Sequence, residues 1–491
     1  MNKTILLLFV ILIFSNFSSI NVFSQGVDIN SNNLNIFYNE MWDVELVDSI
    51  GESGWYSDIK IWDDVTYISY YDRLGGNLKI AIKRDNIWSI ETVDSLNDVG
   101  KYSSIDVDSE GNPYISYFDE TNKNLKYSTW NGMNWVIELI DFEGDVGYDS
   151  SICIDQNDDV HISYYDATNG DLKYARKVDS DWVIEVVAED GNSGTGSSIT
   201  VDSYNNPHIS YANAIGPGLF YAYKDGSNWI NQIVDVECKK VFGSTSLDLD
   251  LDSNPHIAYF DVGTQDEEWY LKHAYYEENN WIIEIIDPDI MNFWYDWGVS
   301  INSGNNEIIH LAYYDWPERN LNYAWKINDI WSIETVDSEG AVGSYCSIDI
   351  DTNGYPSISY MDRSYINLKI ADKKQYSPSK PLKPSGHPFG LSDREYIFTT
   401  SSVDFDGDKI SYGWDWGEDD EIEWTEYYNS NQSVYINHTW KEDGIFQIRV
   451  RAKDENGNQG NWSDLLNFRI IKTHNKIILS NSFLKIFTDL F

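Results

Sequence analysis

An all-β fold is predicted by three features of the sequence. A five-residue pattern, Ile-Ser-Tyr-Tyr-Asp at 68–72, occurs in seven variants at intervals of 47 or 48 residues, apart from one interval of 54. Each variant lies in a unit of four short apolar segments, and Gly, Asn, Asp and Pro separate these segments. Such segments are typical of antiparallel strands. Units of about 45 residues with four strands indicate a β-propeller, here with seven blades over residues 42–374.

The seven units share the same order of landmark residues. The variants of the pattern begin at Ile68, Ile115, Ile162, Ile209, Ile257, Leu311 and Ile358. A serine stands eleven residues before each of them: Ser57, Ser104, Ser151, Ser198, Ser246, Ser300 and Ser347. A tryptophan follows later in the first six units: Trp88, Trp135, Trp182, Trp229, Trp281 and Trp331.

The first strand of the chain is predicted to close the ring. The tryptophan that the seventh unit lacks is found at Trp42, whose segment 42–48 is similar to segment 88–94. We expect segment 42–48 to be the outer strand of the last blade, because closure removes the exposed edges of the sheet. A stacked solenoid is the alternative, which the displaced first strand disfavours.

The repeated polar and aromatic residues are interpreted as structural. The serine begins the inner strand and the aspartate ends the next, so seven copies favour a hydrogen-bonded clamp on a turn. The recurring tyrosines are expected to fill the space between blades. Four consecutive blades carry a histidine before the pattern: His161, His208, His256 and His310. Equivalent positions lie around a ring and do not converge on a metal, which favours a packing role.

Charge and the N-terminus bear on where the protein acts. The chain has 34 basic and 80 acidic residues, a formal charge of −46, which excludes nucleic acid as a partner. Residues 1–24 combine Lys3, an apolar run and small residues, as a signal peptide does. Residues 25–41 form an N-terminal segment, and no later segment is long enough to span a membrane. We therefore expect a secreted or cell-surface monomer.

The unit of 54 residues contains the predicted binding region. Four additional residues follow Asp261 and three follow Trp281, and both loops emerge on the face that carries the recurring serine and aspartate. Aromatic rings there suit stacking on sugars or a protein hot spot, although covering the mouth of the channel is the alternative. The predicted ligand-binding residues are Trp269, Tyr270, Trp294, Tyr295 and Trp297.

Three arginines are a second candidate for ligand binding on this face. Arg73, Arg319 and Arg363 lie in equivalent loops of blades 1, 6 and 7, which adjoin in a closed ring. Three guanidinium groups together could hold a carboxylate or a sulfate. Separate ion pairs with the many nearby acids are the alternative.

The repeat units resemble a known family. The segment Asp-x-x-Gly-Asn-Pro-x-Ile-Ser-Tyr-Phe-Asp at 108–119, followed by Leu-Lys-Tyr at 125–127, is similar to repeats of sialidase-like, BNR-type propellers. The resemblance covers 42–374, and it implies relatives that include glycoside hydrolases and polysaccharide lyases. The sequence departs from sialidases because it has no repeated Ser-x-Asp-x-Gly-x-x-Trp box. No catalytic residues can be assigned from spacing.

The sequence changes character after residue 374. Residues 375–388 are rich in proline, which predicts a stiff linker. Residues 389–471 contain Asp-Phe-Asp-Gly-Asp at 404–408, Trp-Asp-Trp-Gly at 414–417 and His-Thr-Trp at 438–440. This order resembles a PKD-type β-sandwich. The resemblance implies a spacer, or a module for adhesion or carbohydrate contact.

Three aspartates of the PKD-like segment are candidate metal ligands. Asp404, Asp406 and Asp408 offer oxygen donors at alternating positions, which suits Ca²⁺. They lack the downstream glutamate of an EF-hand, so a role in a turn fits equally well. No other cofactor is expected. Residues 472–491 form an amphipathic tail, either a sorting or attachment segment or a docked helix.

These patterns favour a secreted or cell-surface binding or adhesion protein. It would recognise a glycan or a surface protein through the face with the blade-5 insertions. The first alternative is an enzyme, a glycoside hydrolase or polysaccharide lyase, that acts on acidic polysaccharide held by the three arginines. The second is a structural surface protein.

Overall fold

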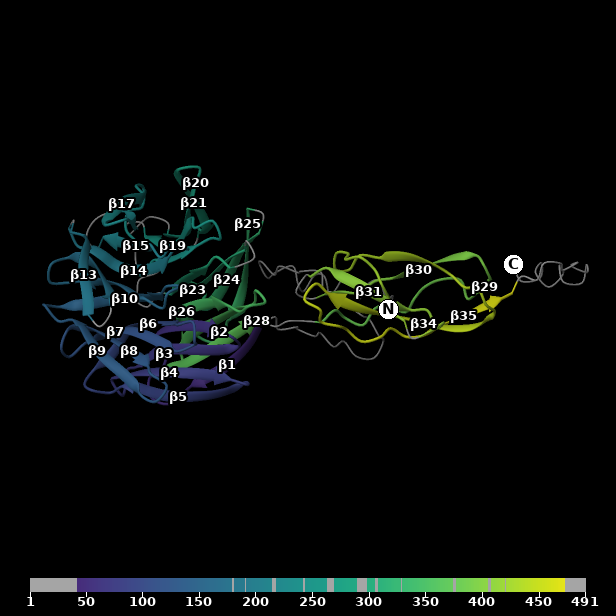
Figure 1. Cartoon of the computed structure of the whole chain (residues 1–491), viewed down its shortest axis with the longest axis horizontal. Helices are drawn as coiled ribbons and strands as arrows, with labels where there is room; N and C mark the ends of the chain where they lie inside the picture. Colours follow the sequence, from purple (N-terminus) through teal and green to yellow (C-terminus); the bar gives the residue numbers. More distant parts are fainter. Residues whose placement is uncertain are drawn as a thin grey trace, which may run out of the picture. The chain divides into compact units, whose positions relative to one another are not determined.

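The computed structural model describes most of the chain between residues 42 and 472, and its regular structure is entirely β-strand (Figure 1). The described residues are 42–178, 181–189, 191–213, 218–241, 243–262, 269–288, 298–304, 308–327, 329–373, 377–404, 408–419 and 421–472. The expected signal peptide, the segment 25–41 and the tail beyond Lys472 lie outside them. No helix capable of spanning a membrane occurs in the described part of the chain.

Seven four-stranded antiparallel sheets follow one another along the described residues up to 373. The strands of the first three are β2 (Trp55–Trp62), β3 (Val65–Asp72), β4 (Asn77–Arg84) and β5 (Ile87–Asp94); β6 (Val99–Val107), β7 (Pro113–Asp119), β8 (Asn124–Trp130) and β9 (Trp135–Asp141); β10 (Val146–Ile154), β11 (Val160–Asp166), β12 (Asp171–Val178) and β13 (Asp181–Ala188). The next three are β14 (Ser193–Val201), β15 (Pro207–Asn213), β16 (Leu219–Asp225) and β17 (Asn228–Asp235); β18 (Ser246–Leu249), β19 (Pro255–Val262), β20 (Trp269–Glu277) and β21 (Asn280–Asp287); β22 (Val299–Asn302), β23 (Ile309–Asp315), β24 (Asn320–Ile327) and β25 (Ile330–Asp337).

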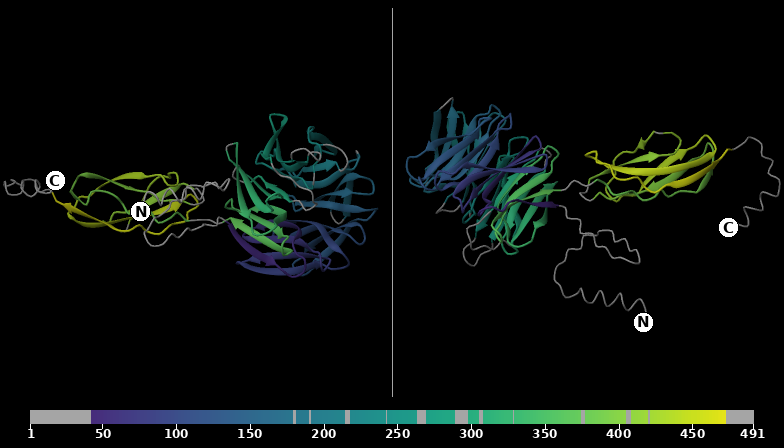
Figure 2. Two further views of the ribbon diagram at one scale, coloured as in Figure 1. Left: turned by 180° about the vertical axis from the view of Figure 1, so that it is seen from behind. Right: turned by 90° about the horizontal axis from the view of Figure 1, so that it is seen from below.

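The seventh sheet joins the start of the repeat region to its end. It consists of β26 (Val342–Ile350), β27 (Pro356–Asp362), β28 (Asn367–Lys373) and β1 (Trp42–Asp48). Strand β1 pairs antiparallel with β28, with Trp42 opposite Lys373. The first strand is therefore the outer strand of the last sheet, as the position of Trp42 predicts. Figures 1 and 2 show the sheets side by side around a common centre, the arrangement of a β-propeller.

Buried tyrosines connect six of the seven sheets to the preceding sheet. The tyrosine at the third position of the repeated pattern is at most 2 % exposed in all seven sheets. In six sheets its hydroxyl donates to the aspartate that ends the outer strand of the preceding sheet: Tyr70 to Asp48, Tyr117 to Asp94, Tyr164 to Asp141, Tyr259 to Asp235, Tyr313 to Asp287 and Tyr360 to Asp337. The prediction that these rings are core is confirmed.

The recurring tryptophans form a second connection, farther from the centre. The indole N–H of the outer strand donates to a glutamate of the preceding sheet, for example Trp182 to Glu138 at 3.0 Å. A lysine from the strand beside the tryptophan binds the same carboxylate, as Lys177 does at 2.6 Å. We call this arrangement, in which a tryptophan and a lysine bind one glutamate of the preceding sheet, a clasp. Similar clasps consist of Trp229, Lys224 and Glu185, and of Trp331, Lys326 and Glu284. Many of the acidic residues thus hold sheets together.

Three of the four histidines, His161, His208 and His310, are buried, and His256 is partly exposed. His161 and His310 each place Nδ1 at 2.7 Å from a tyrosine hydroxyl, of Tyr174 and Tyr323 respectively. Burial lowers the pKa of both imidazoles, that of His310 to about 4. They therefore stay neutral at physiological pH and serve as hydrogen-bonded core.

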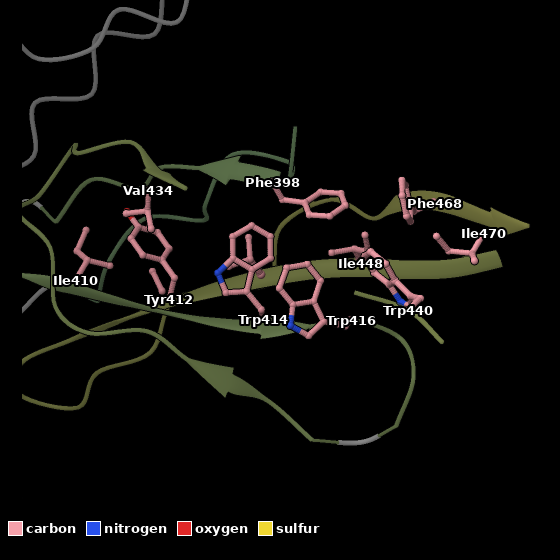
Figure 3. Packing of buried hydrophobic residues seen from close by; sticks show 12 residues of the cluster. Phe398, Ile410, Tyr412, Trp414, Trp416, Val434, Trp440, Ile448, Phe468 and Ile470 are labelled. Atoms are coloured by element: carbon pink, nitrogen blue, oxygen red, sulfur yellow. The ribbon is translucent and has the colours of Figure 1, made fainter. Parts of the chain in front are cut away.

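The C-terminal strands form a β-sandwich. One sheet contains β29 (Phe389–Leu391), β35 (Leu466–Ile471), β34 (Gly444–Asp454), β31 (Ile410–Asp415) and β32 (Glu423–Trp424), and the other β30 (Glu395–Thr400) and β33 (Val434–Thr439). Trp414 and Trp416 stack with ring centroids 4.8 Å apart in the core between the sheets (Figure 3). The proline-containing stretch before β29 runs along β30, where the N–H groups of Ser379 and Ser385 donate to Val403 and Thr399.

Candidate functional site

The inner strands of the propeller carry a distortion near one end. Tyr56, Tyr102, Asp149 and Tyr345 have φ between 49° and 54°, in the left-handed region. The pairing of each of these strands with its neighbour shifts register at this point, as in a β-bulge. A bulge changes the direction of the side chains that follow it, and here those side chains line the propeller axis.

A closed ring of hydrogen bonds follows the bulges. One side-chain oxygen in each inner strand accepts the backbone N–H of the next sheet, at 2.8–3.4 Å. The seven acceptors are Asp58, Ser104, Ser151, Ser198, Ser246, Ser300 and Ser347. The last of them, Ser347, accepts from Ile59 of the first sheet, so the ring has no gap. The recurring serines therefore join sheets, whereas the aspartates that end the second strands clamp turns, as Asp166 does for Asn169.

The first sheet departs from the spacing seen in the sequence. Asp58 lies opposite Ser69, whereas Ser104 lies opposite Ser116, so the first sheet is one residue shorter between these positions. The common spacing of eleven residues suggests that Ser57 is the equivalent of Ser104, but the strand pairing shows that it is not. It occupies the preceding position, where its hydroxyl donates to the carbonyl of Tyr345 at 2.7 Å. Asp58 is thus the single carboxylate in a ring of serines.

A cavity of about 200 Å³ lies on the axis beside this ring and is lined by all seven sheets. Its wall is uneven. Three neighbouring sheets contribute tyrosine rings, and Tyr56 lies between Tyr345 and Tyr102, at centroid distances of 4.8 and 4.6 Å. Glycine and serine occupy the equivalent positions of three other sheets, at Gly196, Ser244 and Gly298. The cavity therefore combines an aromatic side, an open side and many hydroxyl groups.

Two carboxyl groups face this cavity from positions that the other sheets fill differently. Asp58 accepts the hydroxyls of Ser347 at 2.6 Å and Ser104 at 2.9 Å, and Asp149 accepts the N–H of Gly196 at 2.8 Å. Desolvation raises the pKa of both aspartates. Each retains a partly exposed edge because it borders the cavity. Hydroxyl and carboxyl groups beside aromatic rings match the alternating polar and apolar surfaces of a sugar.

A second layer of polar and charged side chains lies on the inner strands, two residues after Asp58 and the serines of the ring. Lys60 forms an ion pair with Asp106 at 3.1 Å, and Asn302 donates to Asp349 at 3.0 Å. Burial raises the pKa of Asp349 to about 6, although Lys60 acts in the opposite direction. These groups surround the axis next to the serine ring.

The predicted aromatic site is only partly within the described residues. Trp269 and Tyr270 begin β20, where they pair with Val262 and Asp261, and both are half-buried. Trp269 packs against the hydrophobic cluster of the fifth and sixth sheets. Lys272 lies 5.9 Å from the ring of Tyr270. The other three predicted residues, Trp294, Tyr295 and Trp297, lie outside the described residues.

Two of the three arginines converge on one ring. The guanidinium carbons of Arg319 and Arg363 lie 5.8 and 6.0 Å from the centroid of Trp316. Arg73 instead lies over Trp55, at 4.8 Å, and pairs with Glu52 at 3.5 Å. The sequence reveals the arginines but not Trp316, which lies directly after the aspartate of the sixth repeat.

The candidate Ca²⁺ ligands of the sandwich are described in part. Asp404 is buried, and its N–H and carbonyl both bind the hydroxyl of Ser430. Asp408 accepts the side-chain amide of Asn456 at 2.7 Å. Asp406 lies outside the described residues. Binding of Ca²⁺ at this turn stays a prediction.

Comparisons with known proteins identify the C-terminal domain. Residues 379–467 match the family model of the PKD domain. The PKD domain of an M14-like peptidase from a Thermoplasmatales archaeon is 28 % identical, covers 20 % of this chain and 98 % of its own, and has a TM-score of 0.19. No curated protein matches the chain.

Two solved structures that are similar to this chain are those of carbohydrate-active enzymes. The polysaccharide lyase Uly1 is 10 % identical, with 66 % of this chain and 90 % of that chain covered and a TM-score of 0.41. The NanB sialidase from Streptococcus pneumoniae is 12 % identical, with coverages of 67 % and 70 % and a TM-score of 0.40. Likenesses at this level assign no activity. The chain is a β-propeller followed by a PKD domain.

Proposed function

We propose that the protein is a secreted or cell-surface binding protein that recognises a glycan. The axial cavity, together with the loops around it on the same face, would be its binding site. One observation carries this proposal: the cavity has a tyrosine wall on three adjacent sheets and hydroxyl or carboxyl groups around the rest of its perimeter. Stacking on an aromatic face with hydrogen bonds to hydroxyls is the chemistry that sugars require.

In this proposed function the seven sheets are the blades of one closed propeller. The closed ring of backbone bonds to Asp58 and the six serines supports this, because it includes the step from the last sheet to the first. Pairing of β1 with β28 supports it independently. A rigid, closed ring holds the groups around the cavity in fixed positions, which reduces the entropy lost on binding.

The location of the protein rests on two other features. The N-terminal 24 residues have the pattern of a signal peptide. A PKD domain at 379–467 is compatible with a surface role, since it can act as a spacer or contact carbohydrate. The residues Trp269, Trp294 and Tyr295 of the fifth blade would extend the site beyond the axial cavity.

A glycan array with the full-length protein and matched variants tests the proposal. Tyr102→Ala and Tyr345→Ala should each weaken binding at least tenfold, because stacking on an aromatic ring is lost. Tyr204→Ala is the control, since Tyr204 is 83 % exposed in the turn between β14 and β15 and is not part of the cavity wall. Binding that is unchanged in both cavity variants would contradict the assignment of the site. Unchanged binding in Trp269→Ala and Trp294→Ala would exclude only the fifth-blade extension.

A second candidate function is an enzyme that acts on acidic polysaccharide. The observation in its favour is the convergence of Arg319 and Arg363 over Trp316, which places two guanidinium groups where they could hold a uronate or a sulfate. The protein should then release new chain ends from a uronic-acid polymer, and Arg363→Ala should reduce the rate. Arg73→Ala serves as control, because Arg73 lies over a different ring. Absence of new chain ends with a panel of such polymers would exclude this function.

A further inference from the structure

The same cluster of charged side chains recurs between neighbouring sheets, so the sheets that lack it can be compared with those that have it. In five sheets a lysine opposite the buried tyrosine places its ammonium between two aspartates, one ending the outer strand of the preceding sheet and one ending the second strand of its own. The five lysines are Lys79, Lys126, Lys173, Lys272 and Lys369. Lys173, for example, lies 3.1 Å from Asp141 and 2.7 Å from Asp166. Two carboxylates and one ammonium thus form a buried unit.

The fourth sheet shows how the cluster can be replaced completely. Phe220 occupies the position of the lysine, opposite Tyr211. Ala188 and Asn213 occupy the positions of the two aspartates. All three charges have therefore changed together, and the site is neutral. Loss of all three charges is expected here, because a carboxylate that stayed buried without the lysine would cost free energy.

The sixth sheet has lost only the lysine. Asn322 lies opposite Tyr313 at the lysine position, but Asp287 and Asp315 keep both carboxylates. Tyr313 donates to Asp287 at 2.8 Å, and the Asn322 amide nitrogen lies 3.2 Å from Asp315 and 3.3 Å from the Tyr313 hydroxyl. Four oxygen-bearing side chains are therefore connected in one cluster, in which Tyr313 and Asn322 are buried and the two aspartates are partly exposed. Burial and the nearby Asp287 raise the pKa of Asp315 to about 6.

The amide of Asn322 is only half satisfied. The side chain is 6 % exposed, and its Oδ1 atom has no hydrogen-bond partner among the described residues. A buried carbonyl oxygen without a partner costs free energy. The amide nitrogen faces Asp315 and Tyr313, and a half-turn about χ2 would put Oδ1 in its place.

We propose that Asp287, Asp315 and Asn322 bind a divalent cation, of the hard type represented by Ca²⁺, at the position where five other sheets hold a lysine ammonium. Carboxylate and amide oxygens are the ligands that Ca²⁺ prefers. The cation would take the position that the lysine ammonium has in the five other sheets and, after this rotation of the amide, would bind Oδ1 of Asn322. Affinity is expected in the range of other extracellular modules, with a Kd on the order of 10⁻⁴ to 10⁻³ M. The inference does not depend on the proposed glycan site.

A second acidic group in the described residues does not share these features. Asp235, Cys238 and Asp261 lie close enough together to hold a metal. However, Lys272 already lies 3.1 Å from Asp235 and 2.6 Å from Asp261, so the group is one of the five lysine clusters.

Calorimetric titration of the chelator-treated full-length protein with CaCl₂ tests the proposal. The Asn322→Lys variant restores the residue that five other sheets carry, so it should fold and should lose one equivalent of Ca²⁺ relative to the natural protein. Ca²⁺ should raise the Tm of the natural protein more than that of this variant. Asp315→Asn is a second variant and should weaken the same binding at least tenfold.

The reverse exchange serves as a matched gain-of-function test. Lys369→Asn would place an amide between Asp337 and Asp362, opposite Tyr360, and should add one equivalent of Ca²⁺. Any binding to the PKD turn is common to all variants and cancels in the comparison. Equal stoichiometry and affinity in the natural protein and Asn322→Lys would overturn the proposal. No Ca²⁺ binding at millimolar concentration would do the same.

Discussion

The hydroxyl of Ser347 donates a 2.6 Å hydrogen bond to the carboxylate of Asp58, and so joins the last sheet of the propeller to the first. Asp58 also accepts the hydroxyl of Ser104 and the N–H of Ile105 from the second sheet, at 2.9 and 2.8 Å. One carboxylate therefore connects three sheets at the point where the chain closes.

Removal of this carboxylate should destabilise the propeller. We expect Asp58→Ala to lower the free energy of unfolding by about 1–3 kcal/mol, because a buried N–H loses its acceptor. Asp58→Ser should cost less, since the other six sheets carry serine there. Urea unfolding of both variants measures the difference. Equal stability of Asp58→Ala and the natural protein would mean that the closing contact is not needed.

The outer clasps should contribute in a similar way. Glu185 accepts the indole N–H of Trp229 at 2.9 Å and the ammonium of Lys224 at 2.6 Å. Glu185→Ala should lower the free energy of unfolding by about 1–2 kcal/mol, as it leaves a partly buried indole without an acceptor. Glu110→Ala, in the exposed turn between β6 and β7, is the control and should change it by less than about 0.5 kcal/mol. A similar loss in both variants would argue against the clasp.

A glycine in the third sheet should be irreplaceable for steric reasons. Gly147 has φ of +103°, and a Cβ there would lie 2.8 Å from Cα of Leu125 in the preceding sheet. Gly132 has φ of +85°, with nothing within 4 Å of the added atom. Gly147→Ala should therefore destabilise by more than about 2 kcal/mol, whereas Gly132→Ala should cost about 1 kcal/mol from backbone strain alone. Thermal unfolding of the two variants separates backbone strain from the steric clash with Leu125. Equal Tm values would contradict close packing of the sheets.

Stability should fall as the pH rises through the pKa of Asp349. The pKa of this carboxyl is about 6 in the folded protein and 3.8 in the unfolded chain, because burial disfavours its charged form. Its contribution is therefore complete below about pH 4 and is lost as the pH rises through 6, about 3 kcal/mol in all. Asp349→Asn removes this dependence and imitates Asn302 at the equivalent position of the sixth sheet. Unfolding free energies measured from pH 4 to 7 should be flatter in this variant than in Asp64→Asn, an exposed control.

The fold was largely predictable because the sequence repeats the same four-strand unit seven times. The displaced Trp42 alone indicates that β1 completes the last sheet, since each unit needs one such tryptophan. The axial site was not predictable, because it depends on a register shift. Equal spacing to the repeated pattern aligns Ser57 with Ser104, and only strand pairing shows that Asp58 occupies that position.

The candidate site residues could be found in the sequence, but their contacts could not. The lengths of the fifth-blade loops identify an irregular region, but the sequence cannot show that Trp269 packs against the core. Arg319 and Arg363 are visible as rare cations, whereas their common contact with Trp316 requires the fold. Asn322 becomes notable only when its position is compared with the five bridging lysines. That comparison needs strand register.

A crystal structure of the full-length protein with the best ligand from a glycan array tests the central claim most directly. We predict a sugar ring in the axial cavity, stacked on Tyr56, Tyr102 or Tyr345 and hydrogen-bonded to hydroxyls or to Asp149. Electron density for the glycan on the PKD domain, or on the face with the turn between β14 and β15, would contradict it.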